Sequence, residues 1–321
     1  GMISHEDLAS YDVEWREPIH GTYRGYDIWS MPPPSSGGAL VVMMLNMLEN
    51  HDVGAMGWGS AEVVHLMVEA QRRAYADRAE HMGDPDFYPV PLAMLTAKDY
   101  ATQRFLDFDP QRASLSEEIG AGNWPAESTE TTHYSVMDGN GVSVAVTTTL
   151  NLGYGNRIVV PGAGFLLNNE MDDFSAKPGA PNAYGLLGDQ ANKIEPGKRM
   201  LSSMTPTIVT QGDKPVLVTG SPGGSTIINT VFQVLVNTLD HGMSIEDAVA
   251  SPRFHHQWMP DIVRHEPGAF ADGAIDVLTE MGHTELVPGG YGIGDANSIL
   301  LKDGIIHGVS DPRSDGGASA Y

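Results

Sequence analysis

The periodicity of the apolar residues changes abruptly near residue 130, and this change constrains the fold more than any other feature of the chain. Residues 108–130 are polar, acidic and without periodicity, which is typical of an exposed, mobile loop. From residue 131 onwards, apolar and polar residues alternate. This pattern predicts strands over residues 131–137 and 142–150, joined by a turn at 138–141. A β-hairpin is therefore expected directly after a loop, with a threonine as its first residue.

The same kind of pattern predicts further hairpins and helices. Two more hairpins are expected, which pair residues 207–210 with 215–219 and residues 298–301 with 305–309. Helical periodicity and capping residues predict helices over residues 38–50, 61–81, 227–241, 245–251 and 274–281. Hairpins interleaved with long helices predict an α+β (layered α/β) architecture, in which helices cover antiparallel sheets.

The predicted helix over residues 61–81 has two distinct faces. Its apolar face carries Val63, Leu66, Met67, Ala70 and Ala74. Its other face carries Arg72, Arg73 and Asp77.

Composition excludes several classes of function. The 321 residues include 41 acidic residues against 18 lysines and arginines, a formal net charge of -23. This charge repels nucleic-acid phosphates and anionic membranes, so we expect neither as a partner. No run of 18 apolar residues could span a bilayer. The absence of cysteine excludes disulfides, zinc–cysteine clusters and thiol catalysis.

Thr131 is a candidate nucleophile because it follows the polar run directly. A hydroxyl needs a base before it can act as a nucleophile. Cleavage between Glu130 and Thr131 would place a free α-amino group beside the Thr131 hydroxyl. Such a group has a pKa of about 7.7–8.0 in short peptides, so one residue would supply both nucleophile and base. The alternative is that Thr131 simply opens a strand, for which threonine has a high propensity.

Polar residues close to the predicted hairpin are further candidates. Thr149 and Asn151 end the return strand, where they could support a nucleophile or form a simple turn. Residues 166–174 place carboxylates, among them Glu170 and Asp173, between apolar neighbours. Such a carboxylate pair suits a bound ammonium group or a hard cation such as calcium, and a solvated turn is the alternative.

Two later segments offer donors for an anion. Ser202 and Ser203 can donate to a carboxylate, although serine pairs are common in loops. Residues 220–225 (GSPGGS) lead from a predicted strand into a helix, where backbone N–H groups could bind a phosphate or form an oxyanion hole. This segment lacks the P-loop lysine and the Rossmann spacing. Ser221 is not in a G-x-S-x-G elbow, so a serine hydrolase is not supported.

The adjacent His255 and His256 invite a metal-binding interpretation. Neighbouring residues of a strand point to opposite faces, so this pair cannot easily share one metal. We expect core or loop histidines, and we predict no metal or other cofactor.

Together these segments resemble the γ-glutamyltranspeptidase family, within the N-terminal-nucleophile hydrolases. The matching stretches follow the family's order and cover essentially the whole chain: PPPSSGG at 32–38, TTHYSVMD at 131–138, TLN at 149–151, LLNNEMDDFSAKPG at 166–179, LSSM at 201–204, GSPGGS at 220–225, PRFHHQW at 252–258 and SDPRSDGGA at 310–318. The resemblance implies an αββα sandwich and self-cleavage between Glu130 and Thr131. Residues 1–130 would then be the C-terminal part of a large subunit and residues 131–321 a small subunit, within one structural domain.

The resemblance also implies a role for each candidate residue. Thr131 would attack the γ-carbonyl of glutathione or a related γ-glutamyl amide, and the acyl group would pass to water or to an amino-acid acceptor. Thr149 would hydrogen-bond to Thr131, and Gly223 and Gly224 would form the oxyanion hole. The substrate α-amino group would be bound by Asn151, Glu170 and Asp173, and its α-carboxylate by Ser202 and Ser203. Residues 177–188, which include Tyr184, would form a lid over the pocket.

The family pattern further predicts that the sandwich is incomplete on its N-terminal side. The family's large subunit is much longer, and its early part supplies strands and an arginine that pairs with the substrate α-carboxylate. No equivalent arginine can be placed in this sequence. Apolar surface exposed in this way could be covered in a homo-oligomer. A periplasmic or extracellular location is also implied by the family.

Two alternatives remain open at this point. The first is a glutaryl or cephalosporin-type acylase of the same superfamily. Glu170 and Asp173 argue against it, because a glutaryl group has no amine for them to bind. The second is an inactive, uncleaved fragment.

Overall fold

A computed structural model describes residues 3–120, 131–177, 179–183, 185–289 and 292–320. The helices are α1 (His5–Ser10), α2 (Gly37–Leu48), α3 (Val53–Met56), α4 (Ala61–His81), α5 (Leu92–Leu95), α6 (Lys98–Arg104), α7 (Ser116–Ile119), α8 (Thr226–Leu239), α9 (Ile245–Ala250) and α10 (Ala274–Met281), with two 3-10 helices, η1 (Glu170–Asp173) and η2 (Gln190–Asn192). The strands are β1 (Ile19–Tyr23), β2 (Tyr26–Ser30), β3 (Thr132–Met137), β4 (Ser143–Thr148), β5 (Thr207–Gln211), β6 (Lys214–Thr219), β7 (Phe254–His255), β8 (Val263–His265), β9 (Leu286–Pro288), β10 (Ser298–Lys302) and β11 (Ile305–Val309).

A six-stranded antiparallel sheet forms the centre of the fold, in the order β1-β2-β5-β6-β10-β11. Two of the predicted hairpins, β5–β6 and β10–β11, lie next to each other in this sheet. The third predicted hairpin, β3–β4, forms a separate two-stranded sheet. All three hairpins are thus confirmed, with ends within two residues of those predicted. The short strands β7, β8 and β9 make a third, small sheet.

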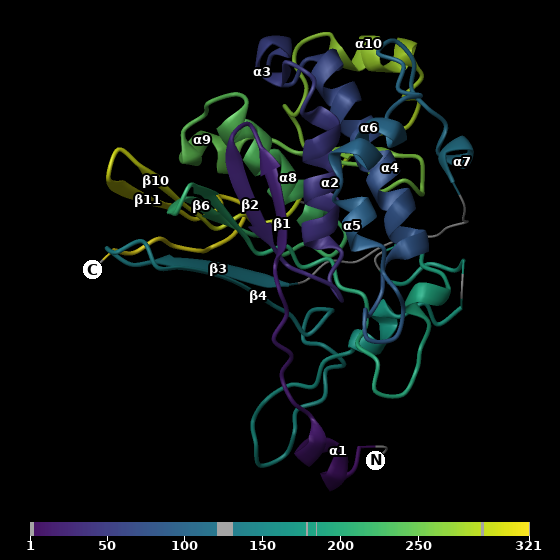
Figure 1. The fold of residues 1–321 in the computed structure, drawn as a ribbon, viewed down its shortest axis with the longest axis vertical. Helices are drawn as coiled ribbons and strands as arrows, with labels where there is room; N and C mark the ends of the chain where they lie inside the picture. Colours follow the sequence, from purple (N-terminus) through teal and green to yellow (C-terminus); the bar gives the residue numbers. More distant parts are fainter. Residues whose placement is uncertain (1–2, 121–130, 178, 184, 290–291, 321) are drawn as a thin grey trace.

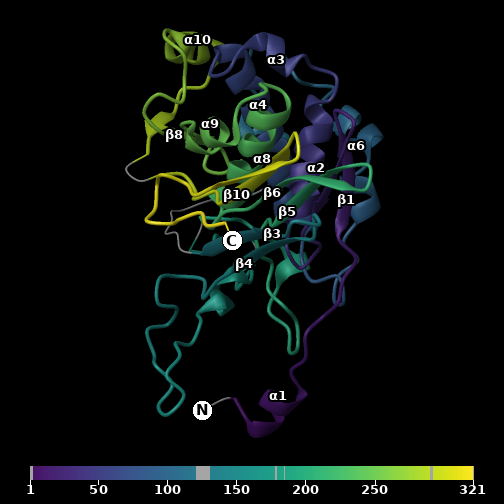
Figure 2. The same ribbon diagram turned by 90° about the vertical axis from the view of Figure 1, so that its left-hand side faces the viewer.

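Helices cover one face of the central sheet. Every residue of α2 is buried, as its nearly uniform apolar sequence predicts, because α2 lies between the strands β1 and β2 on one side and the helix α4 on the other. The helix α8 packs beside α2, and α9 packs on β10 and β11. Figures 1 and 2 show this helical layer beside the sheet. None of the helices in the described ranges has the length and apolarity needed to cross a membrane.

The helix α4 begins at the predicted cap, since the Ser60 side chain accepts a hydrogen bond from the Val63 N–H. Its polar residues are not on a solvated face, however. Arg72, Arg73 and Asp77 are all buried, and each pairs with an oppositely charged residue. Pairing lowers the cost of burying a charge, so ion pairs replace the solvent that periodicity alone suggests for these three residues.

The prediction of an exposed loop from residue 108 to 130 holds for residues 109–112, 115, 117 and 118, which are exposed, but not for the whole of its first part. Residues 108–120 include the short helix α7, and Ser116 is fully buried. The Ser116 carbonyl accepts a hydrogen bond from the Trp258 indole, and its N–H donates to Asp261. The polar residues here satisfy buried partners, which a sequence pattern cannot distinguish from solvation. Residues 121–130 lie outside the described part of the chain.

The β3–β4 hairpin packs on the central sheet opposite the helical layer, through contacts with β6 and β10. His133 and Ser135 face inward, and the Ser135 hydroxyl donates to the Asn297 carbonyl. Tyr134 and Val136 face outward and are each 51% exposed. The described residues therefore form a helical layer and two sheet layers of the layered α+β fold, with no helical layer of their own on the outer face of the hairpin.

Candidate active site

The register of the β3–β4 hairpin places two threonines opposite each other. Thr132 pairs with Thr148, so Thr131 and Thr149 are the next residues beyond this pair. The Thr131 hydroxyl donates to Thr149 Oγ1 at 3.4 Å. The Asn151 N–H donates to the same Thr149 oxygen at 2.8 Å, which fixes its position. The predicted partner of Thr131 is therefore within hydrogen-bond reach, as a supported nucleophile requires.

Asn151 connects the end of the hairpin to the acidic segment that follows. It is 1% exposed and has a left-handed backbone with φ of 73°, a conformation that asparagine tolerates well. Its Nδ2 donates to the Asn169 carbonyl at 3.2 Å, and the Leu152 N–H donates to Asn169 Oδ1 at 3.0 Å. These paired contacts bring the neighbouring helix η1 close to Thr131.

The helix η1 carries the two predicted ammonium-binding carboxylates, Glu170 and Asp173. Burial raises the pKa of Glu170 to about 7. Burial and the nearby Glu170 charge raise the pKa of Asp173 to about 7 as well, while Arg78 acts in the opposite direction. Neither carboxylate has a salt-bridge partner among the described residues. Two half-buried acids without a salt-bridge partner make a site that a positively charged ligand would stabilise.

Ser202 and Ser203 are held by a segment 166 residues earlier in the chain. The Ser36 N–H donates to the Ser202 carbonyl at 2.9 Å, as part of a short parallel pairing between the PPPSSGG and LSSM segments. Gly37 makes this approach possible, because a Cβ atom there would lie 2.2 Å from Thr205 Oγ1. The PPPSSGG and LSSM segments, which are far apart in the sequence, therefore lie side by side next to the pocket.

The glycine-rich turn lies between β6 and α8, as predicted. Gly223 and Gly224 have φ values of +133° and +54°, which favour glycine. No acceptor for either backbone N–H is found among the described residues. Two free N–H groups at the N-terminal end of a helix are what an oxyanion requires.

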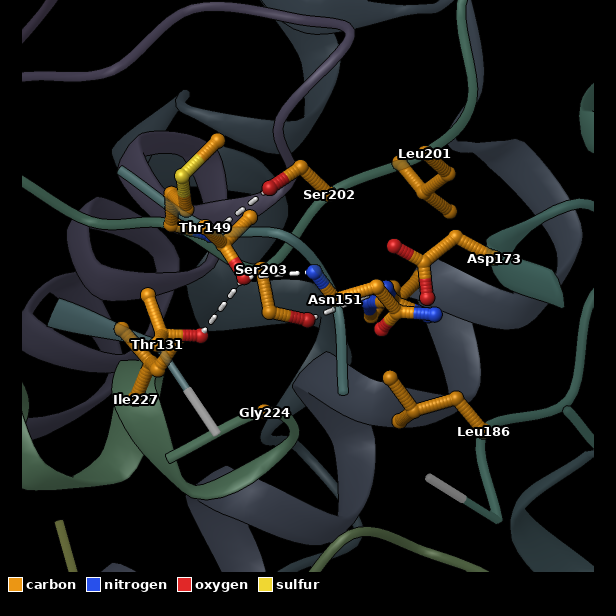
Figure 3. A pocket seen from close by; sticks show the side chains of 12 residues that line it. Thr131, Thr149, Asn151, Asp173, Leu186, Leu201, Ser202, Ser203, Gly224 and Ile227 are labelled. Atoms are coloured by element: carbon orange, nitrogen blue, oxygen red, sulfur yellow. Dashed lines mark hydrogen bonds between the residues drawn. The ribbon is translucent and has the colours of Figure 1, made fainter. Parts of the chain in front are cut away.

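One pocket brings most of the predicted residues together (Figure 3). Its lining comprises Arg78, Thr131, Thr149, Asn151, Asp173, Leu186, Leu201, Ser202, Ser203, Met204, Gly224 and Ile227. Thr131 and Thr149 lie on one side, and Asp173, Leu186 and Leu201 on the other. Glu170 and Gly223 do not line the pocket themselves. Glu170 is close enough to Asp173 to raise its pKa, and Gly223 precedes Gly224 in the chain. Tyr184 lies outside the described residues.

Arg78 is the site residue that the sequence reasoning missed. It belongs to α4, is 3% exposed and lines the pocket. A signal was present in the sequence: Ala70, Ala74 and Arg78 are spaced four apart, so the arginine lies on the predicted apolar stripe. A charged residue at such a buried position is rare and points to a specific role.

A separate cluster could hold a metal ion by geometry alone. Ligand atoms of His65, Glu69 and His283 lie within 4.8 Å of one another. The two histidines already share a hydrogen bond of 2.8 Å, and Glu69 is paired with Arg72 and Arg73. The two guanidinium groups oppose a bound cation, so we assign no metal to this cluster.

The predicted interpretation of His255 and His256 is confirmed. Both are buried core residues, which hydrogen-bond to Asn229 and Asp261 respectively.

Comparisons with known proteins agree on one family. The gamma-glutamyltranspeptidase family model matches residues 1–321. The glutathione hydrolase proenzyme of Escherichia coli is 52% identical over 316 residues, which cover 98% of this chain and 54% of that protein. This chain thus spans about half the length of that relative.

Solved structures show the same relationship. A gamma-glutamyltranspeptidase from Pseudomonas nitroreducens, solved with L-DON, is 47% identical, with a TM-score of 0.57 over 60% of this chain and all of that chain. A cephalosporin acylase from Bacillus halodurans is 27% identical, with a TM-score of 0.84 over all of this chain and 56% of that chain. The motifs, the fold and the extent of the family match together lead to one conclusion: this chain belongs to the γ-glutamyltranspeptidase family.

Proposed function

We propose that this chain carries the nucleophile-bearing part of a γ-glutamyl transferase/hydrolase. The observation that carries the proposal is the single pocket in which the Thr131 hydroxyl lies near Asp173 and the serine pair Ser202 and Ser203. A γ-glutamyl group has a reactive carbonyl at one end and an amine and a carboxylate at the other. The pocket offers a matching group for each of these three features.

The proposed reaction begins after cleavage between Glu130 and Thr131. The pieces 1–130 and 131–321 would remain together as large-subunit and small-subunit parts of one structural domain. The new α-amino group of Thr131 would then serve as the base. Since α2 packs against α8, α4 packs against α10 and β2 pairs with β5, contacts between the two pieces would hold the core together after cleavage.

The chemical steps follow from the groups around Thr131. Its Oγ1 attacks the γ-carbonyl carbon, and its hydroxyl proton passes to the α-amino group. The oxyanion is stabilised by the N–H groups of Gly223 and Gly224. The C–N bond then breaks, the leaving amine takes the proton, and a γ-glutamyl ester remains on Thr131. Water or the amine of an amino-acid acceptor cleaves this ester and restores the hydroxyl.

The ends of the glutamyl group would be recognised by opposite charges. Asn151, Glu170 and Asp173 would bind the α-amino group, and Ser202 and Ser203 the α-carboxylate. The names of the relatives support glutathione or a related compound as donor. A periplasmic or extracellular location is part of the same proposal.

The similarity to a cephalosporin acylase supports one alternative substrate class, glutaryl or cephalosporin-type amides. We therefore expect the chain to release aniline from γ-glutamyl anilide with a kcat/KM at least about 100-fold higher than from glutaryl anilide. The two substrates differ only in the α-amino group, and a desolvated pair of an ammonium group and a carboxylate contributes a difference of this size. Equal rates, or a preference for the glutaryl compound, would favour the acylase instead.

The raised pKa values of the acidic pair predict a pH-dependent affinity. Glu170 and Asp173 bind an ammonium group only when ionised, and each has a pKa of about 7. We expect the inhibition constant of L-glutamate to rise by at least about tenfold between pH 8 and pH 6, since the ionised fraction of each carboxyl group falls about tenfold over this interval. Glutarate lacks the amine and is the control, because its inhibition constant should not rise over this interval. Parallel profiles for the two ligands would contradict this assignment.

A further inference from the structure

The buried Arg78 guanidinium has no acidic partner. It is 3% exposed, and no carboxylate of the described residues lies within salt-bridge distance of it. The other buried arginines of α4, Arg72 and Arg73, are both paired with acids. Burial lowers the pKa of Arg78 to about 10, so the group still carries its charge at neutral pH. The Asp173 charge stabilises the Arg78 cation, but no salt bridge joins the two groups, so a ligand carboxylate would stabilise the buried guanidinium further.

The hydrogen bonds of Arg78 lead to both serines of the pocket. Its Nη2 donates to Ser203 Oγ at 3.2 Å. Its Nε donates to Ser36 Oγ at 2.8 Å, and the Ser36 hydroxyl donates in turn to the Ser202 carbonyl at 2.9 Å. One guanidinium therefore fixes the Ser203 side chain directly and the Ser202 backbone through one intermediate.

These contacts also set the direction of the serine hydroxyls. Ser203 Oγ accepts from Arg78, and Ser202 Oγ accepts from the Met204 N–H at 3.0 Å. No acceptor for either hydroxyl proton is found among the described residues. Because each oxygen already accepts from the protein, each proton is free to be donated into the pocket. Two such donors beside a buried cation form a site for a carboxylate.

We propose that Arg78 is the positioning residue that makes this pocket select substrates with a free α-carboxylate. It orients the Ser202 and Ser203 hydroxyls as donors, and the substrate carboxylate balances its charge. The inference rests on the proposed function and adds to it a positioning residue for the α-carboxylate.

Binding of L-glutamate and of L-isoglutamine, its α-carboxamide analogue, tests the inference by calorimetry on the full chain. Neither ligand has a γ-amide, so binding is measured without turnover. We expect the unmodified chain to bind L-glutamate about 10- to 100-fold more tightly, as hydrogen bonds to a charged group suggest. Arg78→Gln should reduce this ratio to within about threefold, and Arg78→Lys should retain part of it because the charge remains.

Arg72→Gln is the matched control, since Arg72 is another buried arginine of α4 whose partners, Glu69 and Asp261, do not line the pocket. It should destabilise the fold yet leave the ligand ratio unchanged. The inference is overturned if Arg78→Gln weakens both ligands equally, if the ratio stays the same, or if the unmodified chain does not bind L-glutamate. Failure of the proposed function is a separate result, seen as absent γ-glutamyl turnover while the Arg78-dependent ratio persists.

Discussion

Thr131→Ala is expected to abolish both cleavage of the chain and turnover of γ-glutamyl anilide. Removal of the hydroxyl removes the nucleophile of both reactions, and the loss in kcat should be at least about 10⁴-fold. Intact-mass analysis should show two fragments that meet at Glu130 and Thr131 for the unmodified chain. The variant should give a single species of about 34.4 kDa.

Two variants serve as controls for this result. Thr131→Ser keeps a hydroxyl and should retain cleavage and measurable turnover. Thr132→Ala changes the neighbouring exposed threonine of β3 and should leave both reactions intact. Cleavage or turnover in Thr131→Ala would assign the nucleophile to another residue. A single species from the unmodified chain would support the alternative of an inactive, uncleaved fragment.

Arg253→Met is expected to lower the free energy of unfolding by about 3–5 kcal/mol, the largest stability effect that we predict. Arg253 is 1% exposed and donates to Asp311 Oδ2 at 2.7 Å, while Asp311 itself is fully buried. Arg313 bonds to the same Asp311 and to Glu266, which accepts from the Arg253 N–H. Loss of one guanidinium leaves the Asp311 charge without its closest cation. Urea-induced unfolding measures the change.

A half-exposed ion pair provides the comparison. Lys98 Nζ lies 2.8 Å from Glu49 Oε2, with side chains that are 49% and 27% exposed. Lys98→Met should cost no more than about 1 kcal/mol, because solvent already screens the pair. Similar losses for the two variants would show that the Arg253 network contributes no more than a surface contact.

Local sequence patterns were sufficient for the elements of the fold and for the order of the motifs. The β3–β4 hairpin follows from alternation and a tight turn, and α4 follows from its cap and periodicity. The candidate nucleophile at Thr131 follows from where the pattern changes. Each of these features depends on residues close together in the chain, so a linear sequence contains the necessary information.

Only the tertiary structure showed which polar residues are buried and which partners they have. The exposed loop expected from residue 108 contains the buried Ser116, and the polar face of α4 lies among ion pairs in the core. Periodicity records which residues share a face. It does not record what that face packs against, so solvation and buried pairing look alike in a sequence.

The pocket shows the same division most clearly. Thr131 and Thr149 meet through hairpin register, which short-range reasoning can follow. Ser202 is positioned by a hydrogen bond from Ser36, which is distant in the sequence. Arg78 contacts Ser36 and Ser203 because α4 packs against their segments. The proposed role of Arg78 follows from its burial and from the absence of a salt-bridge partner among the described residues. These are properties of the folded surroundings, because desolvation and long-range contacts arise only when distant segments pack together.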